Sequence, residues 1–286
     1  MGNNNNVASG LGNVAQFQLV IGALSAAERN LRRYIELSIE LGIEEENADA
    51  YIFLGQVLSY RGVWQEAERE LDKLLELNKH HIQMQGVTWS YRALRFLLLA
   101  RVNSQSKIAN LKSAIESAQR ALELANEWQK ITERANPNPR DYTRGLWLLG
   151  AAYCANNDLT LAEENLSKAL NLCRQINMVD TEADILLDVA RLRYAQGDFK
   201  DAQEKASEAL MITERSGYVL QGADVNLFLA TLALEGYKLE GLKVLSDKDA
   251  AIHHAKEALR LATCDGPPYY YKVAYEEAER MLEKLK

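Results

Sequence analysis

Small and apolar side chains recur along this chain in blocks that are 40 residues apart. Gly150, Ala190 and Ala230 mark three of these blocks, and each lies in an apolar segment with helical periodicity. A unit that repeats every few tens of residues is typical of stacked helix pairs, because each pair buries its apolar face against its neighbours. The pattern therefore predicts an all-α fold, a right-handed α-solenoid of helix hairpins.

Three blocks share the same internal spacing. Each has a small residue at the predicted crossing of two helices, a turn seven positions later, and a small residue of the second helix twelve positions later. The crossings are at Gly55, Gly150 and Ala190, and the partners on the second helices are Ala67, Ala162 and Ala202. A large side chain at a crossing would push the helix axes apart, which explains the residue type.

The remaining blocks are longer, so they align less directly with the three blocks above. The third block has extra residues at 103–107, and we place its crossing at Arg95. The sixth block contains the insertion GYKLEGLKVLSDKD at 236–249. Pro137 and Pro139 interrupt the pattern between the third and fourth blocks. A domain boundary is possible there, but we favour one continuous superhelix because the spacing resumes immediately afterwards.

We expect a single solenoid over residues 1–286. Its six repeats are predicted at 5–41, 48–79, 82–127, 141–176, 181–216 and 221–263. A capping segment at 267–286 contains a seventh helix from Tyr269 to Leu285. Its many Glu and Lys residues suit the polar end that a solenoid requires.

Charge and composition exclude several classes of partner. The formal net charge is −7 and there is no run rich in Lys and Arg, so we expect no nucleic-acid partner. The longest apolar run, residues 96–100, is too short to span a bilayer, so we expect no membrane association. Three widely spaced cysteines indicate a reducing, cytoplasmic location.

The spacing of the blocks resembles tetratricopeptide repeats along nearly the whole chain. Two segments narrow the resemblance: residues 9–41 followed by LGQVLSYRGVWQEAERELDKLLEL at 54–77, and AAIHHAKEALRLATCDGPPYYYKVAYEEAERMLEKL at 250–285. They look like the C-terminal repeat array of bacterial or archaeal STAND ATPases, the NLR-like (NACHT-type) signalling proteins. In that family an effector and a nucleotide-binding core precede the repeats, and the repeats act as the sensor.

The resemblance implies a non-catalytic recognition module that binds a protein or peptide ligand in its concave groove. The sequence has no GxxxxGK[ST] phosphate loop, and its N-terminus MGNNNNVASG has no signal peptide. We therefore expect a sensor fragment of a larger protein, monomeric when isolated. A free-standing scaffold or adaptor is the first alternative. A small-molecule sensor with a closed superhelix is the second.

The concave groove is expected to carry the ligand. In tetratricopeptide repeats, first-helix residues at −3, +1, +4 and +5 from the crossing point into the groove. The candidates are Phe17, Gln56, Tyr60, Trp89, Arg92, Phe96, Trp147, Arg191 and Tyr194. Aromatic and Arg side chains carry much of the energy of interfaces. The alternative is that Trp89, Phe96 and Trp147 belong to the core between repeats.

Other chemistry-bearing residues have simpler interpretations. The pairs His80-His81 and His253-His254 are adjacent and point about 100° apart on a helix, so they do not chelate one ion. No nucleophile motif is present, and we expect no catalysis, metal or cofactor. Of the tyrosines at 269–271, at most two can be buried on the last helix. We expect an aromatic plug that closes the last repeat, with ligand contact as the alternative.

Overall fold

The computed structural model describes residues 2–133, 136–235, 238–239, 242–243 and 247–286. Over these residues the chain forms thirteen α-helices. They are α1 (Gly2–Val20), α2 (Leu24–Leu41), α3 (Asp49–Tyr60), α4 (Trp64–Leu77), α5 (Ile82–Val102), α6 (Lys107–Ile131), α7 (Pro139–Ala155), α8 (Leu159–Gln175), α9 (Val179–Ala195), α10 (Phe199–Ser216), α11 (Val219–Glu235), α12 (Lys248–Thr263) and α13 (Lys272–Lys284).

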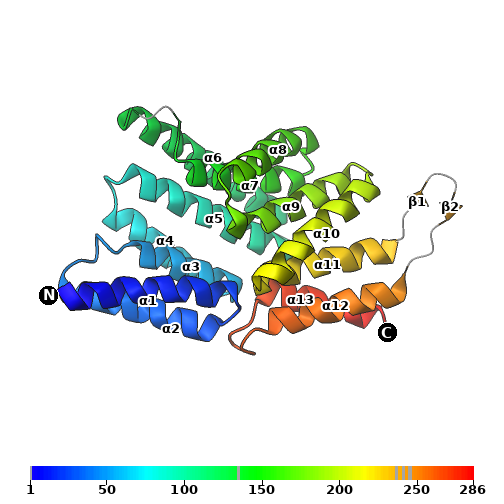
Figure 1. Cartoon of the computed structure of the whole chain (residues 1–286), viewed down its shortest axis with the longest axis horizontal. Coiled ribbons are helices and arrows are strands. Elements are labelled where there is room, and N and C mark those ends of the chain that lie inside the picture. Colours follow the sequence, from blue (N-terminus) through cyan, green and yellow to red (C-terminus); the bar gives the residue numbers. More distant parts are fainter. Residues whose placement is uncertain (1, 134–135, 236–237, 240–241, 244–246) are drawn as a thin grey trace.

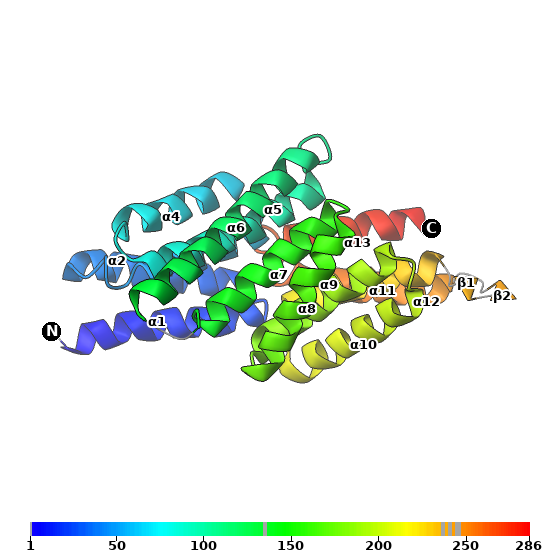
Figure 2. The ribbon, with the colours of Figure 1, turned by 90° about the horizontal axis from the view of Figure 1, so that it is seen from above.

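The predicted all-α, right-handed solenoid of helix hairpins is confirmed (Figures 1 and 2). Odd-numbered helices pack against the even-numbered helices that follow them, and α13 ends the stack. In the insertion of the sixth repeat, the two-residue strands β1 (Lys238–Leu239) and β2 (Leu242–Lys243) pair antiparallel. The rest of that insertion, at 236–237, 240–241 and 244–246, lies outside the described residues.

Small residues hold the helices of each hairpin close together. A Cβ at Gly150 would lie 2.7 Å from Leu166 Cγ, and one at Gly55 would lie 3.1 Å from Leu71 Cγ. Ala190 at the third predicted crossing is fully buried, and so are the three expected partner alanines, Ala67, Ala162 and Ala202. The turns fall where the spacing predicts, and Gly62 and Gly197 have the positive φ (74° and 85°) that glycine adopts readily.

The stack continues across the prolines. Pro139 opens α7 at a helix N-terminus, where its missing N–H costs no hydrogen bond, and Asn138 caps the helix by accepting from Arg140 N. Gly145 of α7 then approaches α6 so closely that a Cβ would lie 2.7 Å from Leu122 Cδ2. The hairpins on the two sides of the prolines are thus packed against each other.

The superhelix closes on itself, because its last helices pack against its first ones (Figure 1). One hydrophobic cluster joins side chains of α1–α3 to side chains of α11–α13. Polar contacts cross the same junction: Ser25 N–H donates to Asp265 Oδ2 over 2.8 Å, and Arg61 Nε donates to Pro268 O over 3.2 Å. The Arg61 guanidinium also lies 4.1 Å from the centre of the Tyr269 ring.

The last helix begins three residues later than predicted, at Lys272 instead of Tyr269. The peptide groups of Tyr269 and Tyr271 bond to the preceding loop and to α12: Tyr269 N donates to Gly266 O and Tyr271 N donates to Ala262 O. Tyr271 is fully buried and meets the Tyr60 ring edge-on at 5.0 Å. Tyr271 is therefore an aromatic plug, as expected, and it closes the ring that the stacked hairpins form.

No helix in the described part of the chain has the combination of length and hydrophobicity that crossing a membrane requires.

Replacing Gly150 by alanine should lower the free energy of unfolding by about 1–3 kcal/mol, because the new methyl group overpacks the contact with Leu166. Gly10→Ala is the matched control. Nothing lies within 4 Å of a Cβ at Gly10, and the helix gains up to about 1 kcal/mol from the same change. Urea denaturation measures both, and equal effects of the two substitutions would contradict the packing argument.

Arg101→Gln should destabilise the closed ring by about 2 kcal/mol, because Arg101 bonds Asp224 of α11 and Glu277 of α13. As a control, Arg260→Gln removes an exposed pair with Glu257 and should change stability by no more than about 0.5 kcal/mol. Thermal and urea unfolding report both values. A neutral Arg101→Gln would show that α13 is held by apolar contacts alone.

Candidate functional site: the central cavity

The closed superhelix surrounds a cavity of about 870 Å³. The inner helices α5, α7, α9 and α11 form most of its wall, and α13 completes it. Its apolar lining includes Leu94, Leu97, Leu98, Ala151, Leu187, Leu227, Phe228 and Met281. Its polar lining is Tyr60, Arg101, Ser104, Lys107, Trp147, Asp184, Asp188, Arg191, Asp224, Thr231, Tyr271, Glu277, Arg280 and Lys284. An apolar wall with a few convergent polar groups is typical of ligand sites of this size.

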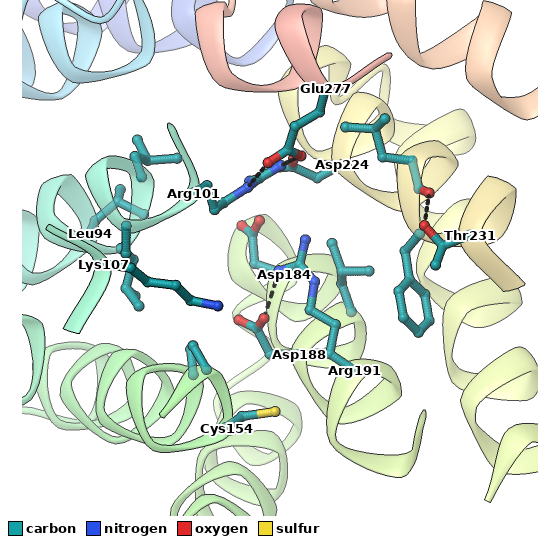
Figure 3. A pocket seen from close by; sticks show the side chains of 18 of the residues that line it. Leu94, Arg101, Lys107, Cys154, Asp184, Asp188, Arg191, Asp224, Thr231 and Glu277 are labelled. Atoms are coloured by element: carbon teal, nitrogen blue, oxygen red, sulfur yellow. Dashed lines mark hydrogen bonds and ion pairs between the residues drawn. The ribbon is translucent and has the colours of Figure 1, made fainter. Parts of the chain in front are cut away.

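Arg101 is the centre of the first polar network in the cavity (Figure 3). Its Nη2 lies 2.7 Å from Asp224 Oδ1 and 2.6 Å from Glu277 Oε2. The Tyr271 hydroxyl donates to Asp224 Oδ2 over 2.8 Å. Burial raises the pKa of Tyr271, so this hydroxyl stays protonated and remains a donor. Two carboxylates and one guanidinium thus hold α5, α11 and α13 together.

Asp188 is the centre of the second network. It accepts a hydrogen bond from Trp147 Nε1 over 2.7 Å and one from Arg191 Nη1 over 2.8 Å. Trp147 belongs to α7, whereas Asp188 and Arg191 lie one turn apart on α9. The tryptophan indole and the arginine are therefore fixed in the wall of the cavity by one buried carboxylate.

Asp184 is the carboxylate in the cavity without a cationic partner among the described residues. It accepts one hydrogen bond, from Gln221 Nε2 over 3.3 Å, and Figure 3 shows it pointing into the cavity. Burial raises its pKa well above the usual value, and the charges of Asp188 and Asp224 raise it further. Gln221 and Arg191 act in the opposite direction and do not cancel these effects.

Three cations lie at the open rim of the cavity. Lys107, Arg280 and Lys284 are exposed, and none of them forms an ion pair within the described part of the chain. Lys107 extends over the cavity from the N-terminus of α6 (Figure 3). Arg280 and Lys284 come from the last turns of α13.

The nine predicted groove residues divide into two sets. Tyr60, Trp147 and Arg191 line the cavity. Six others are not part of the lining: Phe17, Gln56, Trp89, Arg92, Phe96 and Tyr194. Gln56 is half-buried beside Tyr60. Tyr194 packs edge-on against Phe199 and Phe228. Phe17 is 75% exposed on α1, on the same helix as the exposed Val14 and close to Ile21, which is exposed in the turn after α1.

The expected groove positions on α5 were wrong because the crossing was placed at Arg95. In the repeats with crossings at Gly55, Gly150, Ala190 and Ala230 the first helix ends five residues after the crossing, and α5 ends at Val102. That rule puts the crossing at Leu97, and two residues correspond to a rotation of about 200° around the helix. Counted from Leu97, the offsets −3, +1 and +4 give Leu94, Leu98 and Arg101, which line the cavity, whereas the offset +5 gives Val102, which does not.

Arg92 instead faces α4, where it is buried. It pairs with Glu68 over 3.0 Å and with Asp72, and its guanidinium stacks 4.7 Å from the centre of the Trp89 ring. Phe96 is half-buried, with Arg95 over its ring. Arg92 and the Trp89 ring beneath it therefore belong to the packing between α4 and α5, and Phe96 packs beside Arg95 on α5 itself.

Several important cavity residues were absent from the sequence prediction. Asp184 and Asp224 each stand six residues before a crossing, at Ala190 and Ala230, a position outside the offsets considered. Their equal spacing from the crossings was the available signal. Glu277 and Arg280 had no such signal, because they reach the cavity only after the ring closes.

The other singled-out residues have structural roles. Cys154 lines the cavity, and burial beside Asp188 raises the pKa of its thiol to about 12, so it packs as a small neutral group. His81 caps α5 by accepting from Met84 N, and His254 Nδ1 lies 2.8 Å from Asn226 Oδ1. Among the described residues, no three His, Cys, Asp or Glu side chains are grouped as a metal site.

Comparison with known families and structures agrees with this architecture. A tetratricopeptide-repeat family model matches residues 142–215. Aspartyl phosphate phosphatase F from Bacillus subtilis is similar in structure, with 15% identity and a TM-score of 0.59, over 96% of this chain and 68% of that one. A STAND protein with a tetratricopeptide repeat sensor from Pyrococcus horikoshii has 16% identity and a TM-score of 0.51, over 96% of this chain.

The present chain spans 41% of the length of that STAND protein. A search of curated protein sequences finds no match. At these identities the structural similarities concern the fold alone. Together with the matched segment, they show that the predicted tetratricopeptide-type architecture is correct.

Asp184→Asn should increase stability at pH 7.5. The pKa of Asp184 is higher in the folded protein than in the unfolded chain, so the protonated carboxyl favours the folded state. This contribution to stability is complete at pH values below the pKa of the unfolded chain, and it is lost as the pH rises through the pKa of the folded protein. The gain from asparagine should therefore be largest near neutral pH and shrink towards pH 4. Urea unfolding at several pH values measures it, with Asp180→Asn, on the exposed part of the same helix, as control. A destabilised Asp184→Asn at pH 7.5 would contradict the assigned pKa direction.

Proposed function

We propose that this array of tetratricopeptide-type hairpins is a non-catalytic recognition module that binds a short peptide in its central cavity. The observation that carries the proposal is the central cavity of about 870 Å³, lined by an apolar wall and by charged groups from α5, α6, α9, α11 and α13. Solenoids use their concave surfaces for binding, and here that surface is closed into a pocket.

The shape of the cavity narrows the choice of ligand. A long open groove would favour an extended segment of a protein, whereas the ring closed by Tyr271 and α13 admits a short occupant. Trp147 and Arg191 belong to residue types that contribute strongly to binding energy, and both are held in place by Asp188.

We further propose that the array is the sensor part of a STAND-type signalling ATPase in a cytoplasm. This rests on the segments that resemble the STAND repeat arrays and on the similarity to a STAND protein that also carries a tetratricopeptide repeat sensor. The three free cysteines agree with a reducing compartment. A free-standing adaptor uses the same site without the ATPase. As a sensor fragment, the isolated chain is expected to be monomeric.

A small-molecule ligand is the second candidate, and closure of the ring favours it. Such a ligand would occupy the same cavity and contact the same polar groups. The two candidate functions differ in whether peptides bind in the cavity.

Thr231→Trp should obstruct the cavity, because Thr231 lies in its wall on α11 and the indole would project into the space (Figure 3). The assay incubates the protein with a pool of random pentapeptides that have free termini and identifies retained peptides by mass spectrometry after gel filtration. We expect at least tenfold less retained peptide than for the parent protein. Met211→Trp, on the exposed face of α10, is the matched control and should bind normally.

Circular dichroism of both variants establishes that the helices are intact. Equal retention by Thr231→Trp and the parent protein would place binding elsewhere. No retained peptide for the parent protein would refute the peptide proposal and leave the small molecule.

A further inference from the structure

The charges that line the central cavity are separated along its length. The inner part holds four carboxylates, those of Asp184, Asp188, Asp224 and Glu277, and two guanidinium groups, those of Arg101 and Arg191. Arg101 is shared between Asp224 and Glu277, and Arg191 pairs with Asp188. With all four carboxylates ionised the inner part has two negative charges in excess, and Asp184 is the carboxylate without an ion pair in the described part of the chain.

The rim of the cavity carries positive charge, opposite in sign to the charge of the inner part. Lys107, Arg280 and Lys284 are exposed there, and no acidic side chain in the described regions pairs with them. Ala155 and Ala195, the last residues of α7 and α9, belong to the same end of the cavity. A ligand that enters at the rim would thus meet positive charge first and negative charge inside.

We propose that the cavity binds a short zwitterionic peptide whose cationic group pairs with Asp184 and whose carboxylate meets Lys107, Arg280 and Lys284. The proposal rests on the proposed function and adds the polarity and length of the ligand. An ammonium or guanidinium group at Asp184 supplies the missing countercharge in a site that excludes much of the solvent. Between the two ends, Leu94, Trp147 and Leu187 form an apolar collar for the middle of the peptide.

The distance from Asp184 to the rim of the cavity sets the length of the peptide. Asp184 and Ala195 are eleven residues apart on α9, which corresponds to about 16 Å along a helix axis. An extended peptide advances about 3.3–3.6 Å per residue, so four or five residues span the distance from Asp184 to the rim.

The energetics of Asp184 support a ligand-binding role over a structural one. A half-buried carboxylate next to two others raises the free energy of the empty cavity, as the raised pKa of Asp184 reflects. Its single hydrogen bond to Gln221 contributes little in return. Residues that are unfavourable for stability are characteristic of binding sites, where the ligand supplies the missing interaction.

The experiment compares four forms of one random pentapeptide pool: free at both ends, acetylated at every amine, amidated at the C-terminus, and modified at both ends. All four forms are built without arginine and histidine, so that acetylation of the amines removes every cation. Each pool is incubated with the parent protein and with Asp184→Asn, Asp180→Asn, Thr231→Trp and the triple variant Lys107→Ala/Arg280→Ala/Lys284→Ala. Retained peptides are quantified by mass spectrometry, and their affinities by calorimetry.

For the parent protein we expect the unmodified pool to be retained best and the doubly modified pool least. Asp184→Asn should weaken binding of unmodified peptides at least tenfold and remove the preference for a free amine. The triple variant should remove the preference for a free carboxylate. Asp180→Asn, which changes the same charge on the same helix outside the cavity, should leave all affinities unchanged. Because Asp184→Asn is expected to be the more stable protein, unfolding would not explain its loss of binding.

Two results separate the possible failures. Peptides that bind in a Thr231-dependent manner but equally well to Asp184→Asn, or equally well after acetylation, would overturn the charge assignment and leave the proposed function intact. A parent protein that retains no peptide from any pool would refute both.

Discussion

Every larger feature of this molecule depends on how closely the two helices of each hairpin approach. Gly150 leaves no room for a Cβ and Gly55 leaves little, and the facing alanines of the second helices are completely buried. Close packing without large side chains lets each hairpin stack on the next with a similar offset. The repeated offset curves the array, and the curvature brings the inner helices around a common space.

Closure turns this curved wall into a cavity. Tyr271 and the Arg101 network join helices that are more than a hundred residues apart in sequence. The same side chains that close the ring also line the cavity, so the binding surface and the junction share residues. Occupation of the cavity is therefore able to affect how firmly the first and last repeats are held together. In a sensor, that coupling would connect ligand binding to the rest of a larger protein.

Much of the fold was predictable from sequence, because the small residues at Gly150, Ala190 and Ala230 repeat at a constant interval. The helix class, the hairpins and the turns all follow from that interval and from local chemistry. Individual cavity residues were less accessible. An error of two residues in the crossing of α5 turned the expected face toward α4, so Arg92 was named in place of Arg101. Helix periodicity magnifies such errors, since each residue rotates the face by about 100°.

The cavity residues of α13 could not be predicted from the sequence for a different reason. Glu277 and Arg280 become part of the site only because the superhelix completes a turn, and that depends on the sum of small offsets between all hairpins. The tyrosines at 269–271 were expected to form an aromatic plug, but neither the one that is fully buried, Tyr271, nor its partner Tyr60 could be identified from local patterns. Contacts between distant repeats are a global property of the array.

The junction between the first and last hairpins also alters how the array should lose its structure. In an open solenoid each hairpin touches only its neighbours, and the terminal ones fray independently of the middle. Here the cluster shared by α1–α3 and α11–α13 gives both terminal hairpins a second neighbour. Neither end can melt without exposing the apolar surface of the other. The molecule should consequently unfold as one cooperative unit. During folding, the step in which its two ends meet should demand the largest loss of chain entropy.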